Sequence, residues 1–278
     1  MKNPSLTRLS RSSHVFAAAI LFVATGLSHA EPATTPSAVP PVVATTLPAV
    51  IDNTAADKIL DRYIEVTGGQ ALYDAVKSRK IQGELSIPAQ GLTGAMTVAQ
   101  KDEKTALVTL VIEGLGKVIQ GRSGDTIFEF NGISNAARIV EGAEADSLRR
   151  TLSLDDQKAA RDFFVSRQLI GREDVEGKPA DKVLMIAADG TKQTSFYDVE
   201  TGFAVKSEIL LTTQMGEIAA MTKLQDYKAF DGILIPTLTR QFVAGQEIVI
   251  KINKVETNIE LTDADVAPPE SVLPLLKK

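Results

Sequence analysis

Few side chains in this sequence have the types and spacing that catalysis uses. Two acidic pairs, Glu144-x-Asp146 and Asp155-Asp156, could act as paired carboxylates in glycoside or phosphate chemistry. Both pairs lie where helices are predicted to begin, and the positive end of a helix dipole stabilises acidic side chains there without any catalytic role. We therefore do not expect these pairs to be catalytic.

Two further motifs lead to the same conclusion. Ser78 and Lys80 could form a hydrolytic dyad, but they lie on a predicted strand with no other catalytic group beside them. The segment Gly114–Lys117 is similar to a phosphate-binding loop. Ile119 occupies the position of the third glycine of such a loop and no helix follows, so we predict a hairpin turn instead.

The composition excludes most other catalytic chemistry. The chain of 278 residues has no Cys and no Trp, and its two histidines, His14 and His29, both lie in the first 30 residues. The rest of the chain therefore has no Ser-His-Asp triad, no histidine base and no zinc site of the usual kind. Without Cys there are no disulfides and no thiol nucleophiles. We expect no enzymatic activity, no metal and no cofactor.

The charge balance argues against a nucleic acid partner. The sequence has 30 Lys and Arg against 35 Asp and Glu, a formal charge of −5. Residues 1–30 hold three of the basic side chains and no acid, so the remaining chain has 27 basic and 35 acidic side chains and a charge of −8. Nucleic acid binding needs a basic face, so we expect no nucleic acid partner.

The first 30 residues have the three parts of a secretory signal peptide. The basic residues Lys2, Arg8 and Arg11 are followed by the apolar run Val15–Leu27 and by the small-x-small motif Ser28-His29-Ala30. An apolar run of 13 residues is short for a membrane span, although an uncleaved N-terminal anchor is the alternative. We predict cleavage near Ala30 and a periplasmic or secreted mature chain.

The remaining sequence divides into a tether and one domain. Residues 31–53 are rich in proline, which removes backbone donors and fixes φ, so we predict a disordered tether. Residues 54–278 form the predicted domain, with its packed part at about 54–266 followed by a short tail. This length is that of one domain with a sizeable core.

The domain is predicted to open with a helix and to continue mainly as strands. Apolar residues recur at helical spacing after Thr54, and Asp57 completes a capping-box pattern. A helical turn is predicted at Gln70–Lys77 and a helical interruption at Ala143–Gln168. Alternating segments rich in Thr, Val and Ile predict strands at Arg79–Ile87, Leu92–Lys101, Thr105–Glu113, Lys117–Arg122, Thr126–Asn131, Leu169–Val175, Asp181–Ala187, Gln193–Asp198, Ala204–Leu211, Gly216–Phe230, Leu234–Val243 and Glu247–Thr257.

Short turns between these strands predict an antiparallel meander. Asp189-Gly190, Thr201-Gly202 and Asp231-Gly232 each separate two strand-like segments, which is the short-range signal of a hairpin. A meander of this many strands is expected to curl, because large twisted sheets rarely stay flat. We predict a mainly β fold with some α-helix: an incomplete antiparallel β-barrel, or curved sheet, whose open face is covered by helices.

At this level of detail the sequence resembles a known family. The resemblance rests on the order and spacing of several segments over about residues 54–266: YIEVTGGQALYDAVK at Tyr63–Lys77, GKVIQGRSG at Gly116–Gly124, YDVETGFAVK at Tyr197–Lys206, Met215-Gly216-Glu217, Asp226-Tyr227, Asp231-Gly232-Ile233 with Pro236, and VETNIE at Val255–Glu260. These segments are similar to those of the secreted LolA-like, or outer-membrane lipoprotein-sorting-like, proteins. The resemblance implies an incomplete β-barrel with a helical lid over an apolar cavity that holds acyl chains.

Large apolar side chains are the candidate ligand-binding residues. Met and Phe adapt to chain-like ligands, and a strand that is apolar on both faces can be lined by ligand on one of them. Ordinary core packing is the alternative for each residue. The candidates are Leu110, Ile112, Phe128, Phe130, Phe163, Phe164, Met215 and Met221, with Phe163 and Phe164 placed on the lid helix. Arg149 and Arg150 could meet an anionic head group at the cavity mouth or form a solvated helix face.

These observations favour a non-catalytic carrier or sensor that binds the acyl chains of a lipid or lipoprotein. Transient contact with a membrane is compatible with this role. A protein-interaction module of the same fold, with a partner in the cell envelope, is the first alternative, and an enzyme is the second.

Overall fold

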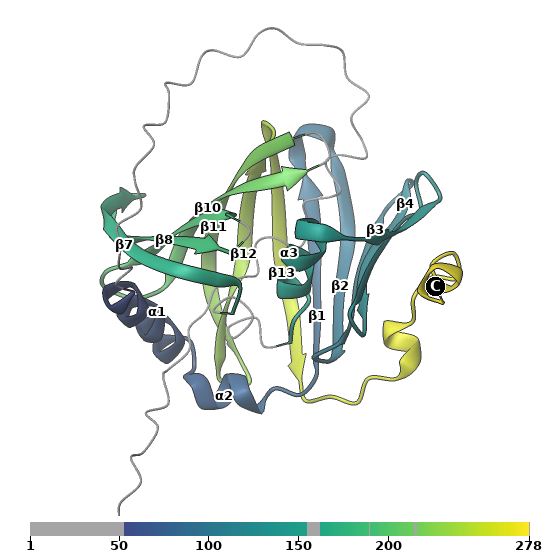
Figure 1. Ribbon diagram of the computed structural model, residues 1–278, viewed down its shortest axis with the longest axis horizontal. Coiled ribbons are helices and arrows are strands. Elements are labelled where there is room, and N and C mark those ends of the chain that lie inside the picture. Colours follow the sequence, from purple (N-terminus) through teal and green to yellow (C-terminus); the bar gives the residue numbers. More distant parts are fainter. Residues whose placement is uncertain (1–52, 155–161, 189, 214–215, 278) are drawn as a thin grey trace, which may run out of the picture.

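The computed structural model describes residues 53–154, 162–188, 190–213 and 216–277 (Figure 1). The predicted leader, nearly all of the predicted tether, the Asp155-Asp156 pair and Met215 lie outside the described residues. Among the helices that are described, none combines the length and the apolar character needed to cross a bilayer.

One sheet of 13 antiparallel strands forms most of the described structure. Its order is β6-β5-β4-β3-β2-β1-β13-β12-β11-β10-β9-β8-β7. The strands are β1 (Arg79–Ile87), β2 (Leu92–Asp102), β3 (Thr105–Ile112), β4 (Gly116–Ser123), β5 (Thr126–Asn131), β6 (Ala136–Val140), β7 (Phe164–Val175), β8 (Lys178–Ala187), β9 (Lys192–Asp198), β10 (Ala204–Thr213), β11 (Gly216–Phe230), β12 (Ile233–Val243) and β13 (Gln246–Thr257).

Two meanders make up this sheet. Strands β1–β6 and strands β7–β13 each follow one another in sequence order, and β1 pairs with β13 to join them. β6 and β7 are the two edges of the sheet, which curves in Figure 1 without closing. The predicted incomplete antiparallel barrel is therefore confirmed. The sequence analysis missed β6, a short strand of sequence AARIV that follows directly on a turn.

Helices cover one side of the sheet, which we call the inner face. α1 (Thr54–Val66) packs on β7–β9 through Ala56, Leu60 and Tyr63. α2 (Gln70–Ala75) and the 3₁₀ turn η2 (Pro88–Gln90) are short. α3 (Gly142–Thr151) packs on β3 and β5 and also contacts β10, so it spans the two meanders (Figure 1).

The C-terminal segment covers part of the opposite, outer face. The 3₁₀ turn η3 (Asp263–Val266) and the helix α5 (Leu273–Leu276) lie beyond β3 and β4 in Figure 1. Val272 is fully buried and packs, together with Leu261 and Val266, on Phe128 and Phe130 of β5. The short segment after about residue 266 therefore packs on the sheet, because the outer face of β3–β5 is apolar and this segment covers it.

The predicted helical interruption at Ala143–Gln168 is only partly correct. α3 begins one residue before this range and ends within it, and residues 162–163 are helical, but Phe164 begins β7 and is not on a helix. Phe164 pairs with Ala187 of β8, and its side chain is fully buried while Val165 is exposed. This alternation is that of a strand, and pairing with β8 outweighs the local helical pattern.

The predicted capping box at the start of α1 is also wrong. Asn53 is the N-cap residue, and Thr54 is already in the helix. Asp57 forms an ion pair with Arg167 of β7 at 2.7 Å, and the side-chain oxygen of Asn53 accepts a hydrogen bond from the Arg167 backbone N–H. These two residues therefore fasten α1 to the edge strand instead of capping the helix.

The C-terminal segment is fastened by Asp265, whose pKa is lowered to about 2 by hydrogen bonds from Thr262 and Lys80. We expect an NMR titration of this carboxyl to give a midpoint near pH 2 instead of 3.8. The folded-state pKa lies below the unfolded one, so Asp265 stabilises the docked segment above about pH 4 and the contribution is lost as pH falls through 2. Thr262→Val should raise the midpoint, whereas the matched change Thr257→Val should not. A wild-type midpoint near 3.8 would contradict these contacts.

Candidate functional site

The inner face of the sheet is apolar over most of its area. One cluster at the end of β1–β3 and β13 contains two of the predicted site residues, Leu110 and Ile112, both nearly fully buried. A second cluster lies beneath α3, and a third beneath α1 contains Phe164. Adjacent rows of paired residues, such as Ile250–Leu85–Gly94–Ile112, run across the junction of the two meanders on this face. The inner face is therefore continuous from one meander to the other.

A partly buried ion-pair network holds the start of α3 on this face. Arg138 of β6 pairs with Glu129 of β5 and with Glu144 of α3, both at 2.6 Å, and Gln120 donates a hydrogen bond to Glu129 at 2.7 Å. Burial raises the pKa of Glu129 in spite of Arg138, and the hydrogen bond to Glu144 raises the pKa of Arg138. Removing either acid would leave Arg138 less well compensated.

The end of α3 is held by a second set of polar contacts. The Gln100 side chain on β2 is 2% exposed, and its amide N–H groups donate to the backbone carbonyls of Leu152 and Ser153. Arg79 of β1 in turn donates to the Gln100 side-chain oxygen at 2.8 Å. Both ends of α3 are thus fixed to the N-terminal meander. These contacts set the positions of the α3 side chains that point away from that meander.

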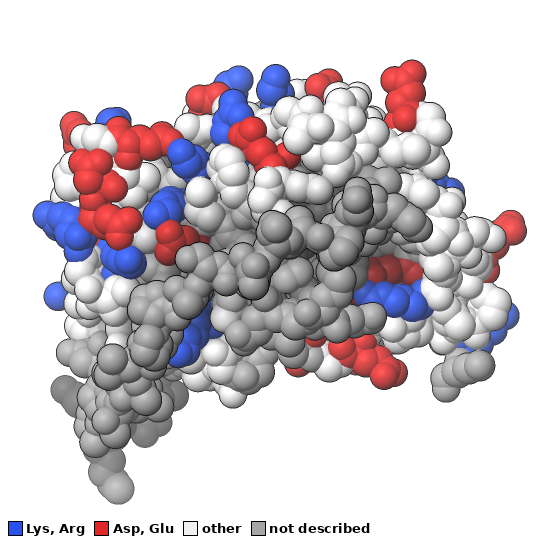
Figure 2. All heavy atoms as spheres, turned by 90° about the horizontal axis from the view of Figure 1, so that it is seen from above, with Lys and Arg blue, Asp and Glu red and all other residues white. Residues whose placement is uncertain are grey.

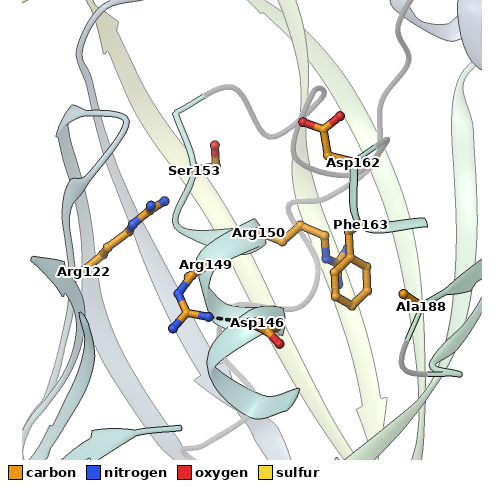
Figure 3. Close-up of a pocket in the computed structure, with 8 residues that line it drawn as sticks. All are labelled: Arg122, Asp146, Arg149, Arg150, Ser153, Asp162, Phe163 and Ala188. Atoms are coloured by element: carbon orange, nitrogen blue, oxygen red, sulfur yellow. Dashed lines mark hydrogen bonds and ion pairs between the residues drawn. The ribbon is translucent and has the colours of Figure 1, made fainter. Parts of the chain in front are cut away.

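That side of α3 borders a pocket with a volume of about 420 Å³. Figure 3 shows Arg149 and Arg150 on α3, Arg122 reaching in from β4, and Phe163 and Asp162 coming from the segment before β7. The full lining is Arg122, Asp146, Arg149, Arg150, Ser153, Asp162, Phe163 and Ala188. Three arginines thus line one pocket between the two meanders, with Arg150 directed toward the ring of Phe163 and Arg149 toward Asp146 (Figure 3).

The two adjacent arginines of α3 have different environments. Arg150 is 3% exposed, and its guanidinium lies 4.9 Å from the ring centroid of Phe163 and 5.2 Å from that of Phe164. Arg149 is partly exposed, pairs with Asp146 and donates to the Asp125 carbonyl oxygen. The structure therefore does not place both arginines on a solvated helix face: Arg150 is a buried aromatic contact and Arg149 faces the pocket.

The predicted apolar candidates do not form one set. Leu110 and Ile112 lie on the inner face, while Phe163 and Phe164 pack beside α1, and Phe163 also lines the pocket. Phe128 and Phe130 lie on the outer face under the C-terminal segment. Met221 is half-buried and pairs with Glu208 and Phe242, on the strand face opposite Thr222, and Met215 is not among the described residues. No observation tests ligand binding by these residues, which stays a prediction.

The outer face is closely packed around Phe128 of β5. Its ring lies against Gly121 on the neighbouring strand, so closely that a methyl group at Gly121 would overlap it. Val272 and Leu261 cover it from the other side. Alternation along β5 groups Phe128 with Phe130 correctly, but it cannot tell which side of the sheet they face.

The candidate catalytic residues have structural contacts instead. Ser78 donates to the Ile259 carbonyl at 2.5 Å, and Lys80 pairs with Asp265. Glu144 and Asp146 pair with arginines, as described above. Gly114–Lys117 forms the β3–β4 turn, as predicted, with the Leu115 N–H donating to the Ile112 carbonyl. Within the described ranges, no three acidic, histidine or cysteine side chains converge as a metal site would require.

Arg122 is a pocket residue that the sequence analysis missed. It alternates with Ile119 and Gly121 along β4, and the usual pattern would place the apolar positions inside and Arg122 in solvent. Both faces of β4 are covered here, so alternation along β4 does not predict which side chains face solvent.

Charged side chains elsewhere are mixed in sign: on the face shown in Figure 2, Lys and Arg are interspersed with Asp and Glu.

Comparison with known proteins relates this architecture to solved structures. No family model matches the chain, and no curated protein matches it in sequence. A LolA superfamily protein from Nitrosomonas europaea superposes with a TM-score of 0.53 at 12% identity, over 79% of this chain and 99% of that one. A DUF1329 family protein from Desulfovibrio piger superposes with a TM-score of 0.53 at 13% identity, over 75% and 95% of the two chains.

The chain has a LolA-like fold. The predicted resemblance is confirmed at the level of the fold, across nearly the whole length of the two solved structures. In this chain the LolA-like sheet carries α3 across its inner face and places the arginine pocket beside that helix.

The contrast between the two arginines of α3 is testable. We expect Arg150→Lys to lower the free energy of unfolding by about 1–2 kcal/mol, because a buried guanidinium stacked on two rings is poorly replaced by an ammonium. The matched change Arg149→Lys should alter it by about 0.5 kcal/mol or less, since that pair is partly exposed. Urea unfolding followed by circular dichroism measures both, and equal effects would contradict the assigned role of Arg150.

Proposed function

We propose that this protein is a periplasmic, non-catalytic carrier or sensor that binds the acyl chains of a lipid or lipoprotein. The observation that carries the proposal is the arginine pocket beside an apolar inner face: an amphiphile has an apolar chain and a polar head, and these two surfaces match them. The LolA-like fold supports this reading because it provides a curved sheet partly covered by helices.

The physical basis of binding would be removal of the chain from water. Each methylene transferred into an apolar site contributes about 0.8 kcal/mol, so a 16-carbon chain supplies roughly 12 kcal/mol before costs. Ordering of the ligand and displacement of α3 or its neighbours would consume part of this. The ion pairs and hydrogen bonds at both ends of α3 limit how far that helix can move.

The arginine pocket would bind an anionic head group. Arg122 and Arg149 line the pocket with side chains that are 13% and 37% exposed. Arg122 donates to the Gly124 carbonyl and Arg149 pairs with Asp146, so an anionic head group would compete with these contacts. Guanidinium groups bind carboxylate and phosphate oxygens through paired hydrogen bonds. Phe163 lies in the same pocket and offers an apolar surface for the first part of the chain.

The predicted leader supports a periplasmic or secreted location. Residues 1–30 have the pattern of a cleaved signal peptide, and cleavage near Ala30 would release the chain into the periplasm or medium. The Pro-rich residues that follow would then be an extended tether at the N-terminus of the mature protein.

A protein-interaction module is the second candidate, and the edge strand β7 favours it. β7 is the last strand in the sheet order, and it exposes Val165 (59%), Leu169 (41%) and Ile170 (46%). An edge strand with exposed apolar side chains can pair with an extended segment of a partner. Such a partner would be another envelope or secreted protein.

Native mass spectrometry distinguishes the two candidates. We expect residues 31–278, purified from a periplasm without detergent, to carry an added mass that extracts into organic solvent as lipid. A bare polypeptide mass, combined with failure to take up fluorescent fatty acids or lipopeptides, would contradict the carrier proposal. The interaction module would then be the better account.

The head-group assignment has its own test. We expect the double variant R122Q/R149Q to bind palmitate roughly tenfold more weakly, which corresponds to about one charged hydrogen bond, and to bind methyl palmitate unchanged. Arg172→Gln removes an exposed arginine paired with Asp181 on β7 and β8, far from the pocket lining, and serves as the matched control. Equal losses for palmitate and its ester would show that the arginines do not bind the head group. Competition with a fluorescent fatty acid measures all of these affinities.

A further inference from the structure

A row of polar side chains interrupts the apolar inner face. Direct pairing aligns one residue from each strand from β8 to β13 in a single row. Val183 of β8 lies at one end of this row and Ile248 of β13 lies at the other. The polar residues between these two ends are Ser195, Ser207, Thr222 and Gln241. Residues paired directly across antiparallel strands face the same side, so these hydroxyl and amide groups form one band on the face that carries α1 and α3.

Gln241 is the exceptional member of this band. It is 1% exposed, and neither its side-chain N–H₂ nor its side-chain oxygen has a hydrogen-bond partner. A buried amide left unpaired in this way is unfavourable for the folded protein, and buried polar groups are otherwise nearly always paired. By contrast, the nearby Gln193 donates to the Ser195 hydroxyl at 3.1 Å. The band thus has one amide with both its donors and its acceptor free.

The neighbours of Gln241 within the sheet are uncharged. The row on one side consists of Gln193, Ile209, Ala220 and Val243, and the row on the other side contains Leu224, Thr239 and Ile250. Thr222 and Thr239 are 5% and 4% exposed, so the amide lies among buried neutral groups. None of these sheet neighbours could pair with a carboxylate or phosphate as a cation, so the sheet presents neutral hydrogen-bonding groups to a ligand at this position.

We propose that Gln241 recognises an amide group in the ligand, so that the bound molecule is an amide-linked acyl chain. The inference rests on the proposed function, and it adds the linkage chemistry of the ligand. An amide presents one N–H and one C=O, which match the free oxygen and the free N–H₂ of Gln241. An ester presents acceptors only and leaves the Gln241 oxygen unpaired, and a plain hydrocarbon leaves both atoms unpaired. The apolar clusters on either side of the band then hold the methylenes that flank the linkage.

Matched uncharged ligands test this assignment. N-ethylpalmitamide and ethyl palmitate have the same number of heavy atoms and differ in one linking group, and both compete with a fluorescent acyl probe. We expect the mature wild-type chain, residues 31–278, to prefer the amide by about tenfold, because one additional satisfied hydrogen bond is worth about that factor. Gln241→Leu should remove the preference, because it weakens binding of the amide by two hydrogen bonds and binding of the ester by only one.

Two controls keep the result interpretable. Gln82→Leu makes the same change at an exposed position of β1 and should keep the preference. Gln241→Leu should also raise the Tm of the unliganded protein by roughly 2–4 °C, because it removes a buried unpaired amide. Gln241→Met provides a second apolar variant of similar length if the leucine variant does not fold.

The outcomes separate this inference from the proposed function. Equal binding of amide and ester by the wild type, or a preference that persists in both Gln241 variants, would overturn the inference and leave the carrier proposal intact. If neither ligand displaces the probe and the chain takes up no acyl compound, both proposals fail.

Discussion

The structure depends on the fact that its sheet does not close. The 13 strands form an antiparallel order with β6 and β7 left as separate edges, so nothing in the backbone pairing covers the inner face. That face must be covered by side chains and helices because it is apolar over most of its area. α1 covers it at β7–β9 and α3 covers it at β3 and β5 while also touching β10. The positions of both helices, and of the arginine pocket between the meanders, follow from this opening.

The buried polar groups on the inner face include three that hold α3 and one amide that has no hydrogen-bond partner. Gln100, Gln120 and Glu129 are buried, and each is used to hold α3. Gln241 is as deeply buried as these three, yet it holds nothing. A folded protein that tolerates such a group accepts a loss of stability at that position, and a contact that appears only when a ligand is present offers a physical reason for it.

Much of the fold could be predicted from the sequence, because alternation and turn chemistry are local properties. β1 and β5 have the predicted bounds, and Thr201-Gly202 and Asp231-Gly232 lie between paired strands as predicted. Phe164 was assigned to the wrong element because its local pattern is helical and only pairing with β8 makes it a strand residue. The C-terminal segment was underestimated because its few apolar residues, such as Val272, become significant only when the outer face is known.

The candidate site was less predictable, for a geometric reason. Period-two alternation separates the two faces of a strand but does not say which face is inside, and here both faces of β3–β5 are covered. Leu110 and Phe128 therefore appeared equivalent in the sequence although they lie on opposite sides of the sheet. The band around Gln241 depends on register across five strands, and no local pattern contains that information.

The junction of the two meanders has a consequence for how the chain folds. Arg79 at the start of β1 pairs with Thr257 at the end of β13, so the central seam joins segments from nearly opposite ends of the domain. Contacts between such distant segments form slowly, because a long loop must close before they yield any stabilisation. Each meander can assemble from local hairpins, but the continuous sheet cannot form until the last strand has been synthesised. A chain that emerges N-terminus first would therefore complete its inner face only after β13 has been synthesised.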